Sequence, residues 1–125
     1  SVEAVEGCRA ARTPDRAFYV QGCNGRLFRH KAAAAVVAVR RSGGTTTFDR
    51  LNAYLTCSEM LIPASNYWNV IHGAAPGEVL EDAEGVQVMR LLGKNMAWLL
   101  KLMENGRGTV GEPPKEDKIF MNFIH

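Results

Sequence analysis

The sequence has few of the residues that build disulfide-linked, metal-binding or membrane proteins. It holds three cysteines in 125 residues, and none of them has the CxxC spacing of zinc or iron–sulfur ligands. No uninterrupted apolar stretch approaches the roughly 20 residues that cross a bilayer, and residues 1–14 lack the apolar centre of a secretory signal. These absences predict reduced thiols, no metal site, no membrane partner and a cytoplasmic location.

Net charge and catalytic motifs are also sparse. A formal net charge of +2 does not favour nucleic acid as a partner, because one arginine pair supplies few phosphate contacts. The chain has neither a Walker sequence nor a G-x-G-x-x-G motif, and no Ser, Cys or carboxylate stands at a recognisable triad spacing. No catalytic side chain is therefore predicted. His72 could act as an acid or base near neutral pH, but without a triad a structural role is favoured.

What is present is the pattern of a one-domain α/β protein, 46% hydrophobic and 22% charged. Residues 31–41, KAAAAVVAVRR, form a continuous apolar run between charges, which is typical of a parallel strand covered on both faces. A glycine turn at 43–44 then leads into a helix, where Thr46 and Asp49 have the capping-box form. A second extended segment is predicted from Leu61 to about Val70.

A long helix is predicted from about Asp82, its N-cap, to about Asn105, with Gly106 as its stop. Gly93, in its interior, indicates a close approach of another backbone. The apolar face is wider than one sheet can cover, so the helix is expected to pack against another helix or a second subunit as well. Two apolar stripes make up this face: Met89, Leu92, Met96, Leu99 and Met103 form one, and Val88, Leu91, Trp98 and Leu102 form the other.

Two segments are candidate ligand sites. The loop from Arg40 to Thr46 stands where a strand's carboxyl end meets a helix N-terminus, the place where open α/β sheets bind ligands, and its glycines would let a flat ligand approach the backbone. Its other interpretation is a tight turn with solvated arginines. Residues 66–69, Asn-Tyr-Trp-Asn, follow the predicted second strand and could stack on a planar ring and bond its edges. Their other interpretation is an aromatic corner packed beneath a loop.

Four segments together resemble a known family: AAVVAVRRSGGTTTFDRLNAYL, IPASNYWNVIHG, PGEVLEDAEGVQVMRLLGKNMAWLLK and the terminal MNFIH. They are similar to the NADPH-dependent FMN reductase family of flavodoxin-like proteins, in the branch of flavodoxin-family and iron–sulfur flavoprotein-like members. The match spans residues 15–125, beginning with DRAFY.

The resemblance implies a flavodoxin-like three-layer sandwich with a parallel sheet, of which residues 1–125 would be the C-terminal portion of a single domain lacking the N-terminal strands. The family's phosphate-binding loop and one of its flavin-binding loops have no counterpart here. Residues 106–125 would form a tail that docks on the domain or on a neighbouring subunit.

The resemblance also implies a function: hydride transfer from NADPH or NADH to bound FMN, and electron delivery to a small-molecule acceptor such as a flavin or quinone. A homo-oligomer, a dimer or tetramer, is expected. The chain alone is expected to bind FMN weakly or not at all, with activity only in a longer protein. The alternative is a non-catalytic oligomerisation or binding module. The implied cofactor-binding residues are Arg40, Arg41, Ser42, Gly43, Gly44, Thr45, Tyr67, Trp68 and Asn69.

Overall fold

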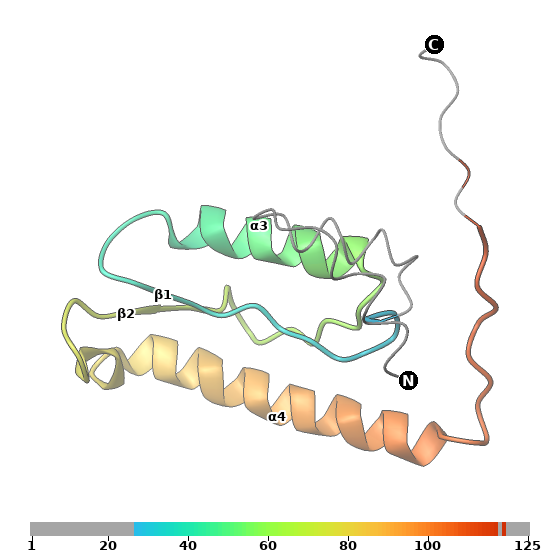
Figure 1. The fold of residues 1–125 in the computed structure, drawn as a ribbon. Coiled ribbons are helices and arrows are strands. Elements are labelled where there is room, and N and C mark those ends of the chain that lie inside the picture. The colour runs from blue at the N-terminus through green and yellow to red at the C-terminus, as the bar shows by residue number, and fades with distance from the viewer. Residues whose placement is uncertain (1–26, 118, 120–125) are drawn as a thin grey trace, which may run out of the picture.

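The computed structural model describes residues 27–117 and residue 119. The expectations for DRAFY and for the apolar ending at 120–125 lie outside these residues. Along the described chain the elements are two strands, two long helices and one short 3-10 helix (Figure 1). They are β1 (Val37–Val39), α3 (Gly44–Cys57), β2 (Val70–His72), η1 (Glu78–Leu80) and α4 (Ala83–Gly106).

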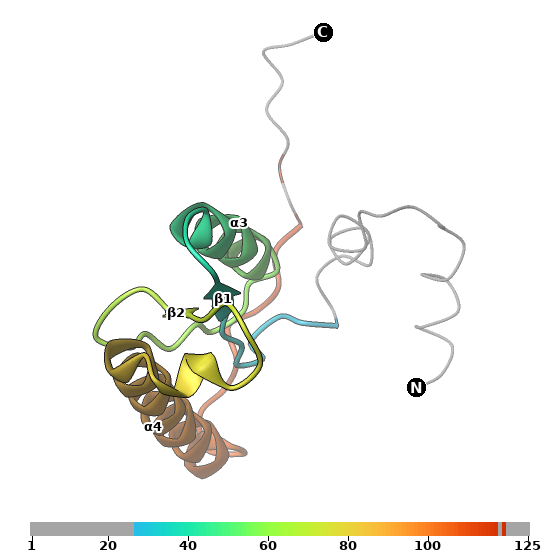
Figure 2. The ribbon, with the colours of Figure 1, turned by 90° about the vertical axis from the view of Figure 1, so that its left-hand side faces the viewer.

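The described elements form three layers. The strands β1 and β2 pair in parallel, with Val37 opposite Val70 and Val39 opposite His72. The helices α3 and α4 lie on opposite sides of this small sheet, as the two perpendicular views show (Figures 1 and 2). The protein is therefore of the α/β class, as predicted, and the arrangement is compatible with part of a flavodoxin-like fold.

The apolar run before the glycine turn is less covered than its sequence predicts. Pairing between the two extended segments begins at a bridge between Ala32 and Leu61, but regular strand occupies only the last residues of the run. Ala35 and Val37 are buried, whereas Val36 between them is 54% exposed. The prediction of a strand covered on both faces is thus wrong for the described residues, because α4 packs on β2 and leaves that side of β1 open.

The second extended segment also differs from its prediction. Regular strand begins at Val70, where the predicted segment was to end, and residues 66–69 come just before β2 instead of after it. The intervening chain, residues 62–69, contains turns and makes no regular ladder. The aromatic pair at 67–68 therefore lies just before the amino end of β2.

The first helix begins two residues before the expected capping residue. Its N-cap is Gly43, with φ +85°, a left-handed backbone conformation that glycine adopts at little cost. No side chain caps the helix, so the capping-box prediction for Thr46 and Asp49 is wrong. Gly44 is needed for packing, because a Cβ there would stand 2.7 Å from Val70 Cγ1 and 3.2 Å from Val39 Cγ2.

The long helix α4 keeps its predicted ends. The Asp82 carboxylate accepts a hydrogen bond of 2.9 Å from the Gly85 N–H, which confirms Asp82 as the N-cap, and the helix ends at Gly106. Val88 is 2% exposed, whereas Trp98 is 64% exposed. The close approach predicted for Gly93 is not found, since no described atom lies within 4 Å of a Cβ built there.

Arg29 joins parts of the chain that are distant in sequence. Its guanidinium donates to the Glu59 carboxylate at 2.7 Å and to the Pro113 carbonyl oxygen at 3.0 Å. Beside it, His30 Nδ1 lies 3.4 Å from a carboxylate oxygen of Glu112. The segment after α4 therefore lies against the turn that precedes the first extended run.

Candidate functional site

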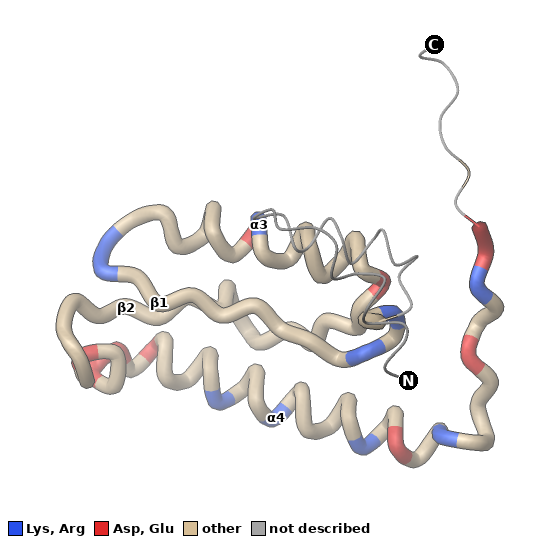
Figure 3. The backbone as a smooth tube through the Cα atoms, in the orientation of Figure 1, with Lys and Arg blue, Asp and Glu red and all other residues tan. Residues whose placement is uncertain are grey.

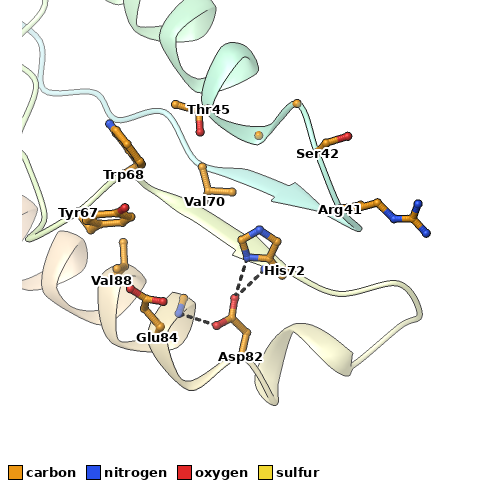
Figure 4. A pocket seen from close by; sticks show the side chains of 13 residues that line it. Arg41, Ser42, Thr45, Tyr67, Trp68, Val70, His72, Asp82, Glu84 and Val88 are labelled. Carbon is orange, nitrogen blue, oxygen red and sulfur yellow. Dashed lines mark hydrogen bonds and ion pairs between the residues drawn. The ribbon is translucent and has the colours of Figure 1, made fainter.

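A pocket of about 270 Å³ opens beside β2, between the first turns of α3 and α4 (Figure 4). It extends from the carboxyl ends of the strands, at Arg41 and His72, to the aromatic pair that precedes β2. Three parts of the chain line it: Arg41, Ser42, Gly43, Gly44 and Thr45 at the start of α3; Tyr67, Trp68, Val70 and His72 around β2; and Asp82, Glu84, Gly85 and Val88 at the start of α4.

The wall at the start of α3 is rich in hydrogen-bond donors. No side chain caps α3, so no side chain occupies the N–H groups of its first turn. The first hydrogen bond of the helical pattern is donated by the Thr47 N–H to the Gly43 carbonyl oxygen at 3.0 Å. Arg41 adds a cation at this end of the pocket, while acidic residues gather at the start of α4 (Figure 3). The pocket therefore has a positive wall and a negative wall.

The aromatic wall is formed by Tyr67 and Trp68. Their ring centroids are 4.7 Å apart with an interplanar angle of 56°. The side chains are still 59% and 48% exposed, so they offer accessible ring faces to a ligand. The Ser65 hydroxyl lies 2.6 Å from the Tyr67 carbonyl oxygen, which fixes the bend of the chain beneath the rings.

Asn69 supports this wall from behind. It is 3% exposed, its amide N–H donates to the Ala35 carbonyl oxygen at 3.0 Å, and its Oδ1 accepts from the Ser65 hydroxyl at 2.7 Å. Its side chain thereby joins the aromatic corner to the neighbouring extended run. Asn69 is absent from the pocket lining, as is Arg40, whereas the other seven residues implied by the resemblance do line the pocket.

A third wall comes from the N-terminus of α4, which the sequence-based site lacked. Asp82 Oδ2 accepts a 2.8 Å hydrogen bond from the His72 backbone N–H and lies 3.3 Å from His72 Nδ1. The N–H groups of Gly85 and then His72 hold the pKa of Asp82 below its usual range, because both donate to its carboxylate. The sequence identified Asp82 as the N-cap of a helix but not as a residue of the site. Only the fold places this cap beside His72.

The chain is similar in sequence to a protein named as a flavoprotein. The chain is 31% identical over 77 residues to an iron–sulfur flavoprotein of Methanocaldococcus jannaschii. The matched region covers 58% of this chain and 40% of that protein. The chain thus spans well under half the length of this relative. No family model and no solved structure matches. At its most specific, this similarity supports a relation to flavodoxin-like flavoproteins.

Two features are absent from the part of the chain that the structure describes. Residues 27–117 and 119 contain no cluster of three or more His, Cys, Asp or Glu side chains that could hold a metal ion. None of the described helices combines the length and the apolar character needed to cross a membrane. The geometry instead combines exposed aromatic faces, backbone N–H donors and opposed charges, which suits a planar polar ligand.

Proposed function

We propose that this pocket binds the isoalloxazine ring of FMN, and that the chain forms the ring-facing part of an NAD(P)H-dependent flavin oxidoreductase. The observation that carries the proposal is the pair of exposed aromatic side chains, Tyr67 and Trp68, facing the donor-rich first turn of α3 across one pocket. Similarity to a protein named as a flavoprotein supports the same ligand class.

The residues present fit a flavin ring. Tyr67 or Trp68 would stack on it, while Arg41 and the N–H groups of Gly44 and Thr45 would face its carbonyl-bearing edge. Gly43 leaves room, because no described atom lies within 4 Å of a Cβ built on it. At about 270 Å³ the pocket is smaller than the roughly 300–1,000 Å³ of typical small-molecule sites, which fits one part of a larger ligand.

Bound FMN would supply the redox chemistry, accepting a hydride from NADPH or NADH and passing electrons to a small-molecule acceptor. The chain's own residues would stack on the ring, orient it through hydrogen bonds and exclude water from one of its faces. This division of labour accounts for a site without a catalytic triad. It also implies weak binding by this chain, because the contacts proposed here hold the ring and none of them holds the phosphate.

The experiment is a titration of FMN fluorescence with wild-type protein and two tryptophan variants at fixed pH. Trp68→Ala should weaken binding roughly fivefold to a hundredfold, because stacking of a planar base on an aromatic side chain contributes about 1–3 kcal/mol. Trp98→Ala, on the exposed face of α4 and outside the pocket lining, is the matched control and should bind as wild type does. The proposal requires weak binding and not its absence, so no binding by wild type even at a large excess of FMN, or equal weakening by both substitutions, would refute it.

A second candidate function is oligomerisation without catalysis, favoured by the exposed apolar side chains of α4. Trp98 is 64% exposed and Leu102 49%, although both belong to the stripe predicted to be covered. We propose that Trp98 and Leu102 pack against a second copy of the chain. Analytical ultracentrifugation should then give a dimer or tetramer for wild type and a smaller species for Leu102→Glu. A wild-type monomer at micromolar concentration would exclude this function.

A further inference from the structure

His72 occupies a place in the pocket that its sequence context does not indicate. It is the last residue of β2, its side chain is 56% exposed, and it lines the same pocket as Arg41 and Trp68. Asp82 orients its ring, because Nδ1 lies 3.3 Å from Asp82 Oδ2, and the same oxygen accepts the His72 backbone N–H at 2.8 Å. The other ring nitrogen, Nε2, is on the side turned away from Asp82 (Figure 4).

Asp82 selects the tautomer of this imidazole. A carboxylate accepts hydrogen bonds and cannot donate one, so a neutral His72 keeps its single N–H on Nδ1, facing Asp82. Nε2 is then an acceptor. When the imidazole takes up a proton, that proton goes to Nε2, which becomes a charged donor. The Asp82–His72 pair therefore converts one atom at the pocket from acceptor to donor as the pH falls.

We propose that His72 is the pH-dependent hydrogen-bond donor of the pocket, presenting Nε2–H to a carbonyl or anionic oxygen at the edge of the bound ring, with Asp82 as its positioning residue. The inference rests on the proposed flavin function. It adds His72 to the residues proposed to bind the ring. It also predicts that binding strengthens as the pH falls, which neither the stacking pair nor the loop at 41–45 implies. Protonation needs no other reactant, since the half-exposed imidazole exchanges its proton with solvent.

Other charged groups near His72 do not reverse this direction. Asp82 stays ionised near neutral pH, because N–H groups hold its pKa below the usual range. Arg41 and Glu84 also line the pocket, one basic and one acidic. In η1, Glu78 is engaged by the N–H groups of Ala74 and Ala75 at 2.7 and 2.9 Å. Among the residue types that line the pocket, histidine is the one whose charge ordinarily changes between pH 5 and 8.

The test measures riboflavin binding by fluorescence quenching at pH 5.5 and pH 8.0. Riboflavin is the probe because it lacks a phosphate, whose second ionisation near pH 6 would add its own pH dependence. Wild type should bind roughly threefold to tenfold more tightly at pH 5.5, because a protonated Nε2 donates a charge-assisted hydrogen bond to the ring oxygen, whereas an unprotonated Nε2 is an acceptor and donates none. In His72→Gln the two affinities should be equal.

Two further variants separate this role from a structural one. His30→Gln is the matched control, because His30 also pairs with a carboxylate, Glu112, at 3.4 Å but lies outside the pocket; it should keep the wild-type ratio of affinities. Asp82→Ser keeps a side-chain oxygen that can cap α4 but removes the partner of the His72 ring. Its affinity ratio should fall towards one, while its helix content by circular dichroism stays at the wild-type value.

The outcomes distinguish this inference from the proposed function. If His72→Gln keeps the wild-type ratio, or if wild type binds equally at both pH values, His72 is not the donor and flavin binding stands without it. If wild type binds neither riboflavin nor FMN at either pH, both the flavin function and the role of His72 are refuted. A loss of the ratio in His30→Gln as well would place the pH dependence outside the pocket and overturn the inference.

Discussion

Replacing Gly44 by alanine tests how closely the first turn of α3 packs against the sheet and thereby forms the pocket. A Cβ at this position would stand 2.7 Å from Val70 Cγ1, and 3.2 and 3.4 Å from the two γ-methyl carbons of Val39. The two valines belong to the paired strands β2 and β1, and β-branched side chains are stiff at χ1. The methyl group is therefore accommodated only if the start of the helix moves away from the sheet.

The expected size of the effect follows from two opposing contributions. Inserting a methyl group into a packed site costs about 1–3 kcal/mol, and exchanging glycine for alanine in a helix returns up to about 1 kcal/mol. Gly44 is the first residue of α3, outside the helix interior to which the full gain applies, so Gly44→Ala should lower the free energy of unfolding by about 1–2 kcal/mol. Gly93→Ala is the matched control: it lies in the middle of α4 with no described atom within 4 Å of its Cβ position, so it should raise this free energy by up to about 1 kcal/mol.

Urea unfolding followed by far-ultraviolet circular dichroism measures both variants. With a slope of about 1–3 kcal/mol per molar, the midpoint of Gly44→Ala should fall by roughly 0.3–2 M and that of Gly93→Ala should rise. The slopes should stay equal to wild type. A Gly44→Ala protein as stable as wild type, or a Gly93→Ala protein less stable than wild type, would refute the packing described here.

Three further predictions concern the support of the pocket. Asn69→Ala should lower the free energy of unfolding by about 2 kcal/mol in urea, because it leaves the Ala35 carbonyl oxygen without its amide donor; an unchanged midpoint would contradict this. Val88→Ala should cost about 2 kcal/mol by the same assay, since it removes two methyl groups from a side chain that is 2% exposed, and a loss below about 0.5 kcal/mol would count against a core at this point. Because N–H donors lower the pKa of Asp82 from its ordinary 3.8, its carboxylate stabilises the fold above that pH and this contribution disappears as the pH falls through the lowered value. Between pH 5 and pH 2 the melting temperature should therefore fall further in wild type than in Asp82→Asn, and parallel curves would contradict the assignment.

The parts of the fold that sequence predicted are those set by local chemistry. Asp82, standing before the apolar helical pattern, is enough to identify the start of α4, because a cap is formed by the side chain and the nearest backbone N–H groups, here that of Gly85. The helix also ends at Gly106 as predicted, although Gly106 is its last helical residue and the positive φ belongs to Gly108. The glycines at 43–44 likewise indicated a sharp change of direction between a strand and a helix, although the cap proved to be Gly43 and not a side chain.

The parts that sequence did not predict depend on contacts between distant residues. The continuous apolar run at 31–41 resembles a strand covered on both faces, but only the placement of α4 over β2 decides that Val36 stays exposed. The exposure of Trp98 has the same origin, since amphipathic spacing defines an apolar face and does not supply its partner.

The candidate site divides in the same way. The loop at 40–46 was selected because it joins a strand's carboxyl end to a helix N-terminus, and the aromatic pair at 67–68 was selected by residue type. The structure brings residues 41–45 and both rings to one pocket. Asn69 was selected with them for its amide, yet that amide is used to join two backbone segments. The pairing of His72 with Asp82, ten residues apart, depends on η1 returning the chain to the end of β2, and no spacing rule indicated it.

The most direct test of ring binding in this pocket uses the two tryptophans of the sequence, which give two indole N–H signals in a proton–nitrogen correlation spectrum. Trp68 lines the pocket, Trp98 lies on the exposed face of α4, and a Trp98→Phe variant assigns the two signals by removing one. Adding FMN should shift or broaden the Trp68 signal and leave the Trp98 signal in place. A spectrum in which neither signal moves at excess FMN, or in which only the Trp98 signal moves, would contradict flavin binding at this site.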